Sequence, residues 1–170
     1  SAPIALGMIF SVLYLRLDIV MLQLMTEEKM VGFYSAAYKL FEVAVVLPHS
    51  FMLVLFPTLV EEYHSNRSQF KSRFKKALVI YSLIGGSIAL TLWNFSYEII
   101  TLIYGDKFLP SIDVLKIISW AILLFFVNFL LSNMLIASGL ERINTWNLVG
   151  VTVLNIILNL VLIPLYGGIG

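Results

Sequence analysis

The stretch IISWAILLFFVNFLLSNMLIASGL, residues 117–140, contains no Asp, Glu, Lys or Arg. A helix needs about 20 mainly apolar residues to cross the hydrocarbon core of a bilayer, so this stretch alone predicts a membrane span. The whole chain of 170 residues agrees, because 60% of its residues are hydrophobic and only 12% are charged. An average soluble domain is about 25% charged. The sequence therefore indicates an all-α membrane protein.

Uncharged stretches recur on both sides of residues 117–140 and divide the chain into five spans. The charge-free stretches are 1–15, 43–60, 77–97, 117–140 and 143–170. They predict transmembrane helices at about 3–25, 32–59, 77–103, 113–138 and 142–165. Because the links are short, neighbouring helices should run antiparallel in an up-down bundle. We expect residues 1–170 to form a single transmembrane lobe fragment of a longer chain.

The link at 60–76 sets the expected orientation. It contains five of the eleven basic residues: Arg67, Lys71, Arg73, Lys75 and Lys76. By the positive-inside rule this link is cytoplasmic, and alternation then places the links before residue 32 and after residue 103 outside. Phe70 and Phe74 are four residues apart in RSQFKSRFKK. That segment reads either as an amphipathic lead-in lying along the headgroups or as a solvated basic loop.

Composition and motifs exclude several classes of function. The net charge of +1 leaves no basic excess for nucleic acid, and the chain has no Cys and two His. No catalytic dyad, metal-ligand spacing or phosphate-binding glycine loop is present, so we expect neither an enzyme nor a bound metal or cofactor. Glu61, Glu62 and His64 resemble a metal set by spacing, but they lie in a polar link beside five basic residues.

Four ionisable residues fall at membrane depth. Arg16 and Asp18 lie in the first expected helix, and Lys39 and Glu42 lie in the second. On insertion scales each such charge costs about 2.5–3.5 kcal/mol near a helix centre, whereas one apolar residue returns about 0.3–0.6 kcal/mol. These side chains must therefore face protein or water rather than lipid.

Folding the first two helices about Glu28 places Asp18 level with Lys39, and Arg16 level with Glu42. We expect Asp18 and Lys39 to form a structural ion pair and Arg16 to face a cavity. Along the second helix, one polar stripe follows helical spacing: Ser35, Lys39, Glu42, Val46 and His49. Two alternatives stay open. The four charges can form a network that only holds two helices together, and His49 can act as a proton relay or as a lone polar group beside the Pro48 kink.

Amide side chains form a second polar set on the last two helices. Asn128 lies on the fourth expected helix, and Asn155 and Asn159 lie on the fifth. Folding these helices about Glu141 brings Asn128 level with Asn155, which predicts hydrogen bonds between the helices. The alternative is a water-lined surface on the fifth helix.

Several segments, in order, resemble a known family. They are RLDIVMLQ, VGFYSAAYKLFEVAVVLP, LFPTLVEEY, LIYGDKFLPSIDVLKI, LIASGLE and LNIILNLVLIPLYGGIG. Together they resemble the oligosaccharide-lipid flippases, the polysaccharide-biosynthesis branch of the superfamily that includes the multidrug and toxin extrusion (MATE) exporters. The resemblance implies a bacterial or archaeal cytoplasmic-membrane protein of 12 to 14 spans in two lobes. By the YGDKF link, this fragment resembles the second lobe, although the lobes are alike and the first remains possible.

The resemblance also implies a substrate and a set of binding residues. Family cavities carry cations for the phosphates of an undecaprenyl-pyrophosphate-linked oligosaccharide, and Arg16 and Lys39 match these by position. The implied partners are that lipid-linked oligosaccharide, membrane lipid and the remaining lobe of the same chain. Two rivals stand beside this interpretation. A MATE-type drug exporter would use Asp18 or Glu42 as its ion site, and a membrane glycosyltransferase would need surface carboxylates that lack a supporting constellation here.

Overall fold

A computed structural model describes residues 19–166, and every regular element in that range is helical. Residues 19–25 are helical and end at a turn at Thr26. The later elements are α2 (Glu28–Ala44), α3 (Val46–Ser65), α4 (Arg67–Asn94), α5 (Ser96–Tyr104), the short 3-10 helix η1 (Asp106–Phe108), α6 (Ser111–Ala137) and α7 (Glu141–Tyr166). The predicted all-α membrane fold is confirmed.

Four helical stretches within residues 19–166 are long and apolar enough to cross a membrane. They are Glu28–Ser65, Arg67–Asn94, Ser111–Ala137 and Glu141–Leu165. The expected span at 3–25 lies mostly outside the described residues. The described part of the chain is thus a multi-pass membrane protein.

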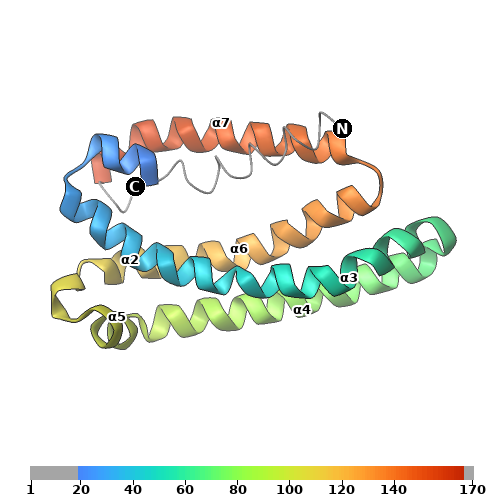
Figure 1. Cartoon of the computed structure of the whole chain (residues 1–170), viewed down its shortest axis with the longest axis horizontal. Coiled ribbons are helices and arrows are strands. Elements are labelled where there is room, and N and C mark those ends of the chain that lie inside the picture. The colour runs from blue at the N-terminus through green and yellow to red at the C-terminus, as the bar shows by residue number, and fades with distance from the viewer. Residues whose placement is uncertain (1–18, 167–170) are drawn as a thin grey trace.

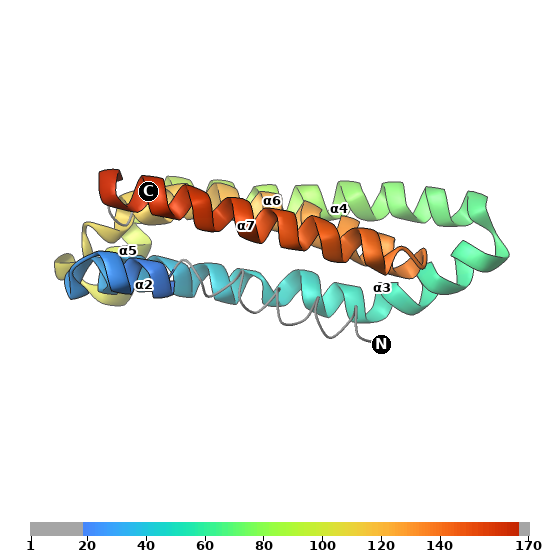
Figure 2. The ribbon, with the colours of Figure 1, turned by 90° about the horizontal axis from the view of Figure 1, so that it is seen from above.

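The helices run up and down along one common direction (Figures 1 and 2). The turn between α3 and α4 and the turn between α6 and α7 lie at one end of the bundle, and the start of α2 and helix α5 lie at the other. Helix α7 diverges from α6 after their shared turn. Gly139 ends α6 with φ of +72°, and the amide of Leu140 donates to the carbonyl of Leu135, a motif that favours glycine.

The expected link at 60–76 is helical instead. Helix α3 continues to Ser65 and α4 begins at Arg67, so only Asn66 separates them. The Asn66 side chain caps α4 by accepting from the amide of Gln69 at 3.1 Å. The Phe70 ring is buried, and its centroid lies 5.2 Å from that of Tyr63 on α3. Phe70 therefore packs on α3 rather than against lipid headgroups. The segment is a helix and not a solvated loop.

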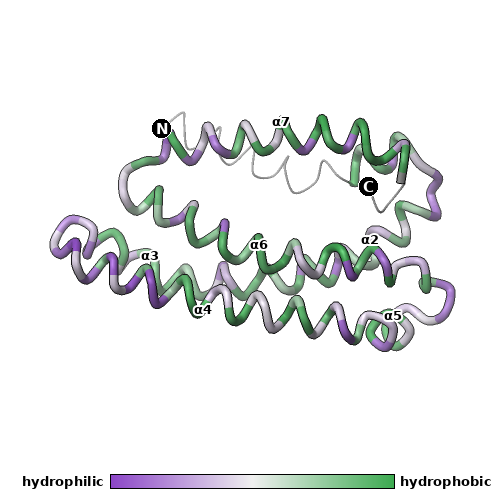
Figure 3. The backbone as a smooth tube through the Cα atoms, turned by 180° about the vertical axis from the view of Figure 1, so that it is seen from behind, coloured by the Kyte–Doolittle hydropathy of each residue, from purple (hydrophilic) through white to green (hydrophobic). Residues whose placement is uncertain are grey.

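The hairpin of α3 and α4 is longer than a bilayer is thick. Helix α4 has 28 residues, which is about 42 Å against a hydrocarbon core of about 30 Å. The hairpin tip extends beyond the other helices in Figure 1, and Figure 3 shows it as the more hydrophilic end of the hairpin. The basic run of α4 thus lies at the polar end of the hairpin, where it extends beyond the other helices.

Two expected helices are broken rather than continuous. The helix expected at 32–59 begins at Glu28 and breaks at Val45, because Pro48 has no N–H to offer the carbonyl of Ala44. The helix expected at 77–103 ends at Asn94, and α5 follows after Phe95. The Asn94 side chain donates to the Leu90 carbonyl at 2.7 Å, which is typical of a residue that competes with the helical bonds.

The core forms around α6, which packs against α2, α3 and α4. Buried alanines on α2 and α4 keep the helices close: Ala36, Ala37, Ala44, Ala77 and Ala89. The closest approach is at Gly85 on α4, where an added Cβ would lie 3.0 Å from Cβ and Cγ of Phe126. Small residues at helix contacts are the usual means of packing in lipid, where burying apolar surface gains little.

The two ends of the bundle give a direct test of orientation. The chain lacks cysteine, and Ser65 and Asp106 are exposed at opposite ends. In intact cells, Asp106→Cys should react with an impermeant thiol reagent, and Ser65→Cys should react only after the cells are opened. The reverse labelling pattern would contradict the orientation that the basic run predicts.

Candidate functional site

An ion pair between Lys39 and Glu42 lies on α2 at membrane depth. The Lys39 Nζ atom is 2.8 Å from Oε2 of Glu42, one helical turn away. At 1.5 Å per residue, Lys39 lies about 16 Å along the helix from Glu28, inside the candidate membrane-spanning stretch Glu28–Ser65. The structure thus places these two predicted site residues in direct contact.

This pair is exposed on the described part of the chain. The Lys39 side chain is 69% exposed and that of Glu42 is 31% exposed. Charges at this depth are costly against acyl chains, so they face other protein or a water-filled cavity. The face of α2 that carries Lys39 and Glu42, which we call the charged face, is therefore the candidate functional site.

His49 extends this face onto the first turn of α3. Its Nδ1 atom lies 2.7 Å from the carbonyl oxygen of Val45, and because a carbonyl only accepts, Nδ1 carries the proton of that bond. The ring is exposed, and its centroid lies 4.3 Å from that of Phe129 on α6. The imidazole is thus positioned by two contacts, while its role as a proton relay stays a hypothesis.

Arg16 and Asp18 lie outside the described residues. The predicted pair of Asp18 with Lys39 therefore stays a prediction, as does the placement of Arg16 in a cavity. Within residues 19–166, the recorded ionic partner of Lys39 is Glu42.

The amide side chains predicted to join α6 and α7 make recorded hydrogen bonds within their own helices. Asn128 is exposed on α6, and Asn133 donates to the carbonyl of Phe129 at 2.8 Å. On α7, Nδ2 of the buried Asn159 lies 3.3 Å from Oδ1 of Asn155. These bonds each join residues four apart on one helix, and hydrogen bonds between α6 and α7 stay a prediction.

A second ion pair, between Glu62 and Arg73, ties α3 to α4. Nε of Arg73 lies 2.8 Å from both carboxylate oxygens of Glu62, and a terminal guanidinium nitrogen lies 2.7 Å from Oε1. The Glu62 side chain is 9% exposed and that of Arg73 is 46% exposed. The Glu62 carboxylate is thus engaged by a cation, and among residues 19–166 no group of three or more ionisable side chains could hold a metal ion.

This pair is not among the sequence predictions, because the run of charge at 60–76 indicates a polar link rather than two helices. A partial signal was present, since Glu62 lies four residues before Asn66 and Arg73 seven residues after it, and a long arginine side chain can cover that offset in a helical hairpin. Two further contacts support the hairpin. The Arg67 guanidinium lies 3.5 Å from the centroid of the Tyr63 ring, and the buried Tyr81 hydroxyl donates to the carbonyl of Pro48 at 3.0 Å.

Glu62→Gln should lower the thermal unfolding temperature of the full-length protein by several degrees in detergent. The substitution keeps the shape of the side chain but removes the charge that holds Arg73 through charge-assisted hydrogen bonds. Glu61→Gln is the matched control, because Glu61 is exposed and its side chain makes no recorded bond within the described range. Equal unfolding temperatures for the two variants would show that the pair does not stabilise the hairpin.

Comparison with known proteins gives one match. The family model described as MatE matches residues 3–161. No curated protein and no solved structure matches the chain. The matched range covers nearly the whole chain and includes the charged face, His49 and the amide residues of α6 and α7.

Proposed function

Because the chain belongs to the MatE family, whose members are membrane transporters, we propose that it is part of a flippase for lipid-linked oligosaccharides. In this proposal the full-length protein moves undecaprenyl-pyrophosphate-linked sugar units across a bacterial or archaeal cytoplasmic membrane by alternating access. The products feed the synthesis of a surface polysaccharide such as O-antigen or capsule. The observation that carries the proposal is the exposed Lys39–Glu42 pair at membrane depth on α2.

The substrate chemistry suits cationic residues in a pathway. A lipid diphosphate carries negative charge through the membrane, and its phosphates accept hydrogen bonds from guanidinium and ammonium groups. Arg16 supplies a planar group that can hold a phosphate with two bonds, and Lys39 supplies a point charge. The remaining lobe of the same chain completes the cavity.

The Lys39–Glu42 pair allows an exchange of partners. An exposed ion pair one helical turn apart contributes at most about 1 kcal/mol to stability in water. A phosphate can therefore replace the Glu42 carboxylate beside Lys39 at a small cost in free energy. When the phosphate leaves, Glu42 takes its place again and neutralises Lys39. The pair thus offers a way to bind and release an anion while Lys39 keeps an anionic partner in both states.

A MATE-type, cation-coupled drug exporter is the second candidate. The observation that favours it is the Glu42 carboxylate, which lies at membrane depth and could release Lys39 when it is protonated or binds a cation. In that case Glu42 or Asp18 would be the coupling site. The family match is compatible with both candidates.

Deleting the gene and restoring it separates the two candidates. The proposal predicts that deletion abolishes surface polysaccharide and that the full-length gene restores it, while accumulation of a fluorescent cationic dye does not change. Raised dye accumulation with normal polysaccharide would reject the flippase and support the exporter.

A further inference from the structure

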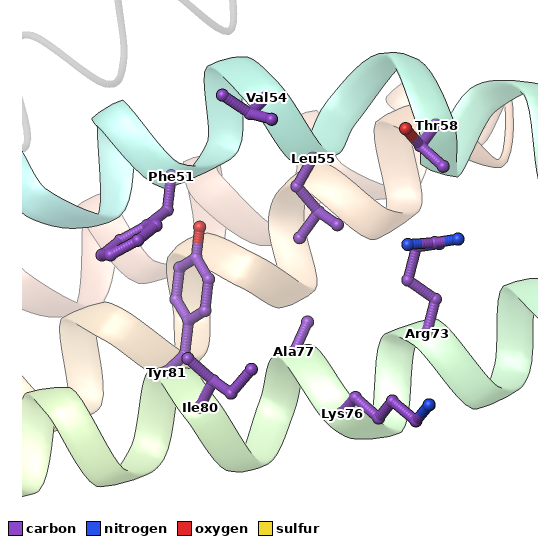
Figure 4. Close-up of a pocket in the computed structure, with 9 residues that line it drawn as sticks. All are labelled: Phe51, Val54, Leu55, Thr58, Arg73, Lys76, Ala77, Ile80 and Tyr81. Atoms are coloured by element: carbon purple, nitrogen blue, oxygen red, sulfur yellow. The ribbon is translucent and has the colours of Figure 1, made fainter.

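An open groove of about 400 Å³ lies between α3 and α4, close to the hairpin tip (Figure 4). Its lining includes Thr58, Arg73 and Lys76 together with Phe51, Val54 and Ile80. Figure 4 shows Arg73 and Tyr81 extending from α4 toward α3, and Leu55 extending from α3 toward α4. The groove is thus framed by side chains of both helices of the hairpin.

The groove is polar at one end and apolar at the other. Arg73, Lys76 and Thr58 lie toward the hairpin tip, and Phe51 and Ile80 lie toward the middle of the helices. On α4 the last cation is Lys76, and the apolar part of the helix starts at Ala77. The groove therefore spans the change from basic to apolar residues on α4, which matches a phospholipid with its charged headgroup and apolar acyl chains.

The polar end carries positive charge that is open to a ligand. Lys76 is exposed, and no ionic or hydrogen-bonding partner is recorded for it within residues 19–166. Arg73 binds Glu62 through Nε and one terminal nitrogen, which leaves other N–H groups on a side chain that is 46% exposed. Two cations beside one carboxylate leave a net positive charge that complements a phosphate.

The apolar end suits an acyl chain. Val54 is 80% exposed and Ile80 is 50% exposed, and in a bilayer such side chains contact lipid tails. The one polar side-chain atom at this end, the hydroxyl of Tyr81, is already bonded to the carbonyl of Pro48. An acyl chain can therefore lie here without leaving a polar atom unbonded.

We propose that this groove binds one anionic phospholipid of the cytoplasmic leaflet. Its phosphate lies against Lys76 and Arg73, and one acyl chain lies along Val54 and Ile80. The bound lipid fixes the depth of the α3–α4 hairpin in the membrane, where anionic headgroups gather beside basic residues. The proposal is independent of the transported substrate, because it concerns a different surface and a resident lipid.

Native mass spectrometry of the purified full-length protein tests the polar end. Titration with dioleoyl phosphatidylglycerol should give one tight lipid adduct, and dioleoyl phosphatidylcholine should bind more weakly. Lys76→Gln should weaken phosphatidylglycerol binding about fivefold, since one basic residue near a membrane surface contributes about 1 kcal/mol. Lys75→Gln, the matched control, removes the same charge from a neighbour that does not line the groove, and it should change binding less than twofold.

Ile80→Trp tests the apolar end without changing charge. A larger side chain should fill the groove and weaken phosphatidylglycerol binding, whereas Val79→Trp on the adjacent exposed position should not. Equal losses for Lys76→Gln and Lys75→Gln would overturn the proposal in favour of a diffuse basic surface. Equal affinity for both lipids, or displacement of phosphatidylglycerol by millimolar inorganic phosphate, would overturn it as well.

Discussion

Gly85→Ala should destabilise the helix bundle by about 1–3 kcal/mol, the usual range for forcing an extra methyl group into a packed contact. The new Cβ would lie 3.0 Å from Cβ and Cγ of Phe126 and 3.4 Å from the Cα of Leu123. Phe126 is 1% exposed, so its side chain has little room to move. The loss should appear as a lower thermal unfolding temperature of the full-length protein in detergent.

Gly86→Ala is the matched control, because it makes the same substitution one residue along α4. There the nearest atom to the added Cβ is Cδ1 of Leu123 at 4.0 Å, which is an ordinary contact. Alanine also favours a helix over glycine by up to about 1 kcal/mol, so this variant should be neutral or more stable. If both alanine variants unfold at the same temperature, Gly85 is not required for the close approach of α4 and α6.

Arg16→Ala should abolish surface polysaccharide in cells that carry the full-length gene, while the amount of protein in the membrane stays normal. The proposal gives the Arg16 guanidinium a phosphate contact that alanine cannot make. Arg16→Lys should keep partial activity, because it retains the charge and loses the two-bond geometry. Polysaccharide can be measured by lectin binding at the cell surface and protein by immunoblot.

Arg142→Ala is the control for loss of one positive charge, since Arg142 is exposed at the start of α7 and lies at a helix end rather than at membrane depth. It should leave polysaccharide unchanged. A purely structural Arg16 predicts that protein and polysaccharide fall together in Arg16→Ala. If Arg16→Ala cells keep their full surface polysaccharide at a normal protein level, Arg16 does not bind the substrate. Lys39 or residues of the other lobe would then bind it.

Hydrophobicity was sufficient to predict the class of fold and the last two helices. The charge-free stretch 117–140 lies almost wholly within α6 at Ser111–Ala137, and α7 at Glu141–Tyr166 is close to the expected 142–165. For α6, a glycine-containing turn ends the helix where the apolar pattern ends. The end of the apolar stretch therefore also marks the end of the helix.

At the hairpin of α3 and α4, the end of the apolar stretch does not coincide with the end of a helix. A run of charge marks where a helix leaves the hydrocarbon core, but it does not end the helix, because lysine, arginine and glutamine are good helix formers. Residues 60–76 were therefore expected to be a link and are instead helical on both sides of Asn66. The Glu62–Arg73 pair depends on this geometry, so it could not be predicted while the link was taken as irregular.

The structure describes three of the ionisable residues of the candidate site. Lys39, Glu42 and His49 were expected on one stripe, and the structure places Lys39 beside Glu42 on α2 and His49 against Phe129. The expected pairing of Lys39 with Asp18 is untested, because Asp18 lies outside the described residues, and the contact with Glu42 lies within one turn of α2. A contact within one turn forms whatever the register of the helices, so it has to be considered first.

Translocation by the purified full-length protein in vesicles tests the central claim most directly. Vesicles are prepared with an undecaprenyl-pyrophosphate-linked oligosaccharide, and an impermeant reagent that oxidises sugars reports the fraction in the outer leaflet over time. The account predicts that the protected fraction becomes accessible within minutes in vesicles with the protein, and far more slowly with Arg16→Ala or without protein. A protected fraction that stays unchanged, in vesicles whose protein still drives proton-coupled efflux of a cationic dye, would contradict it.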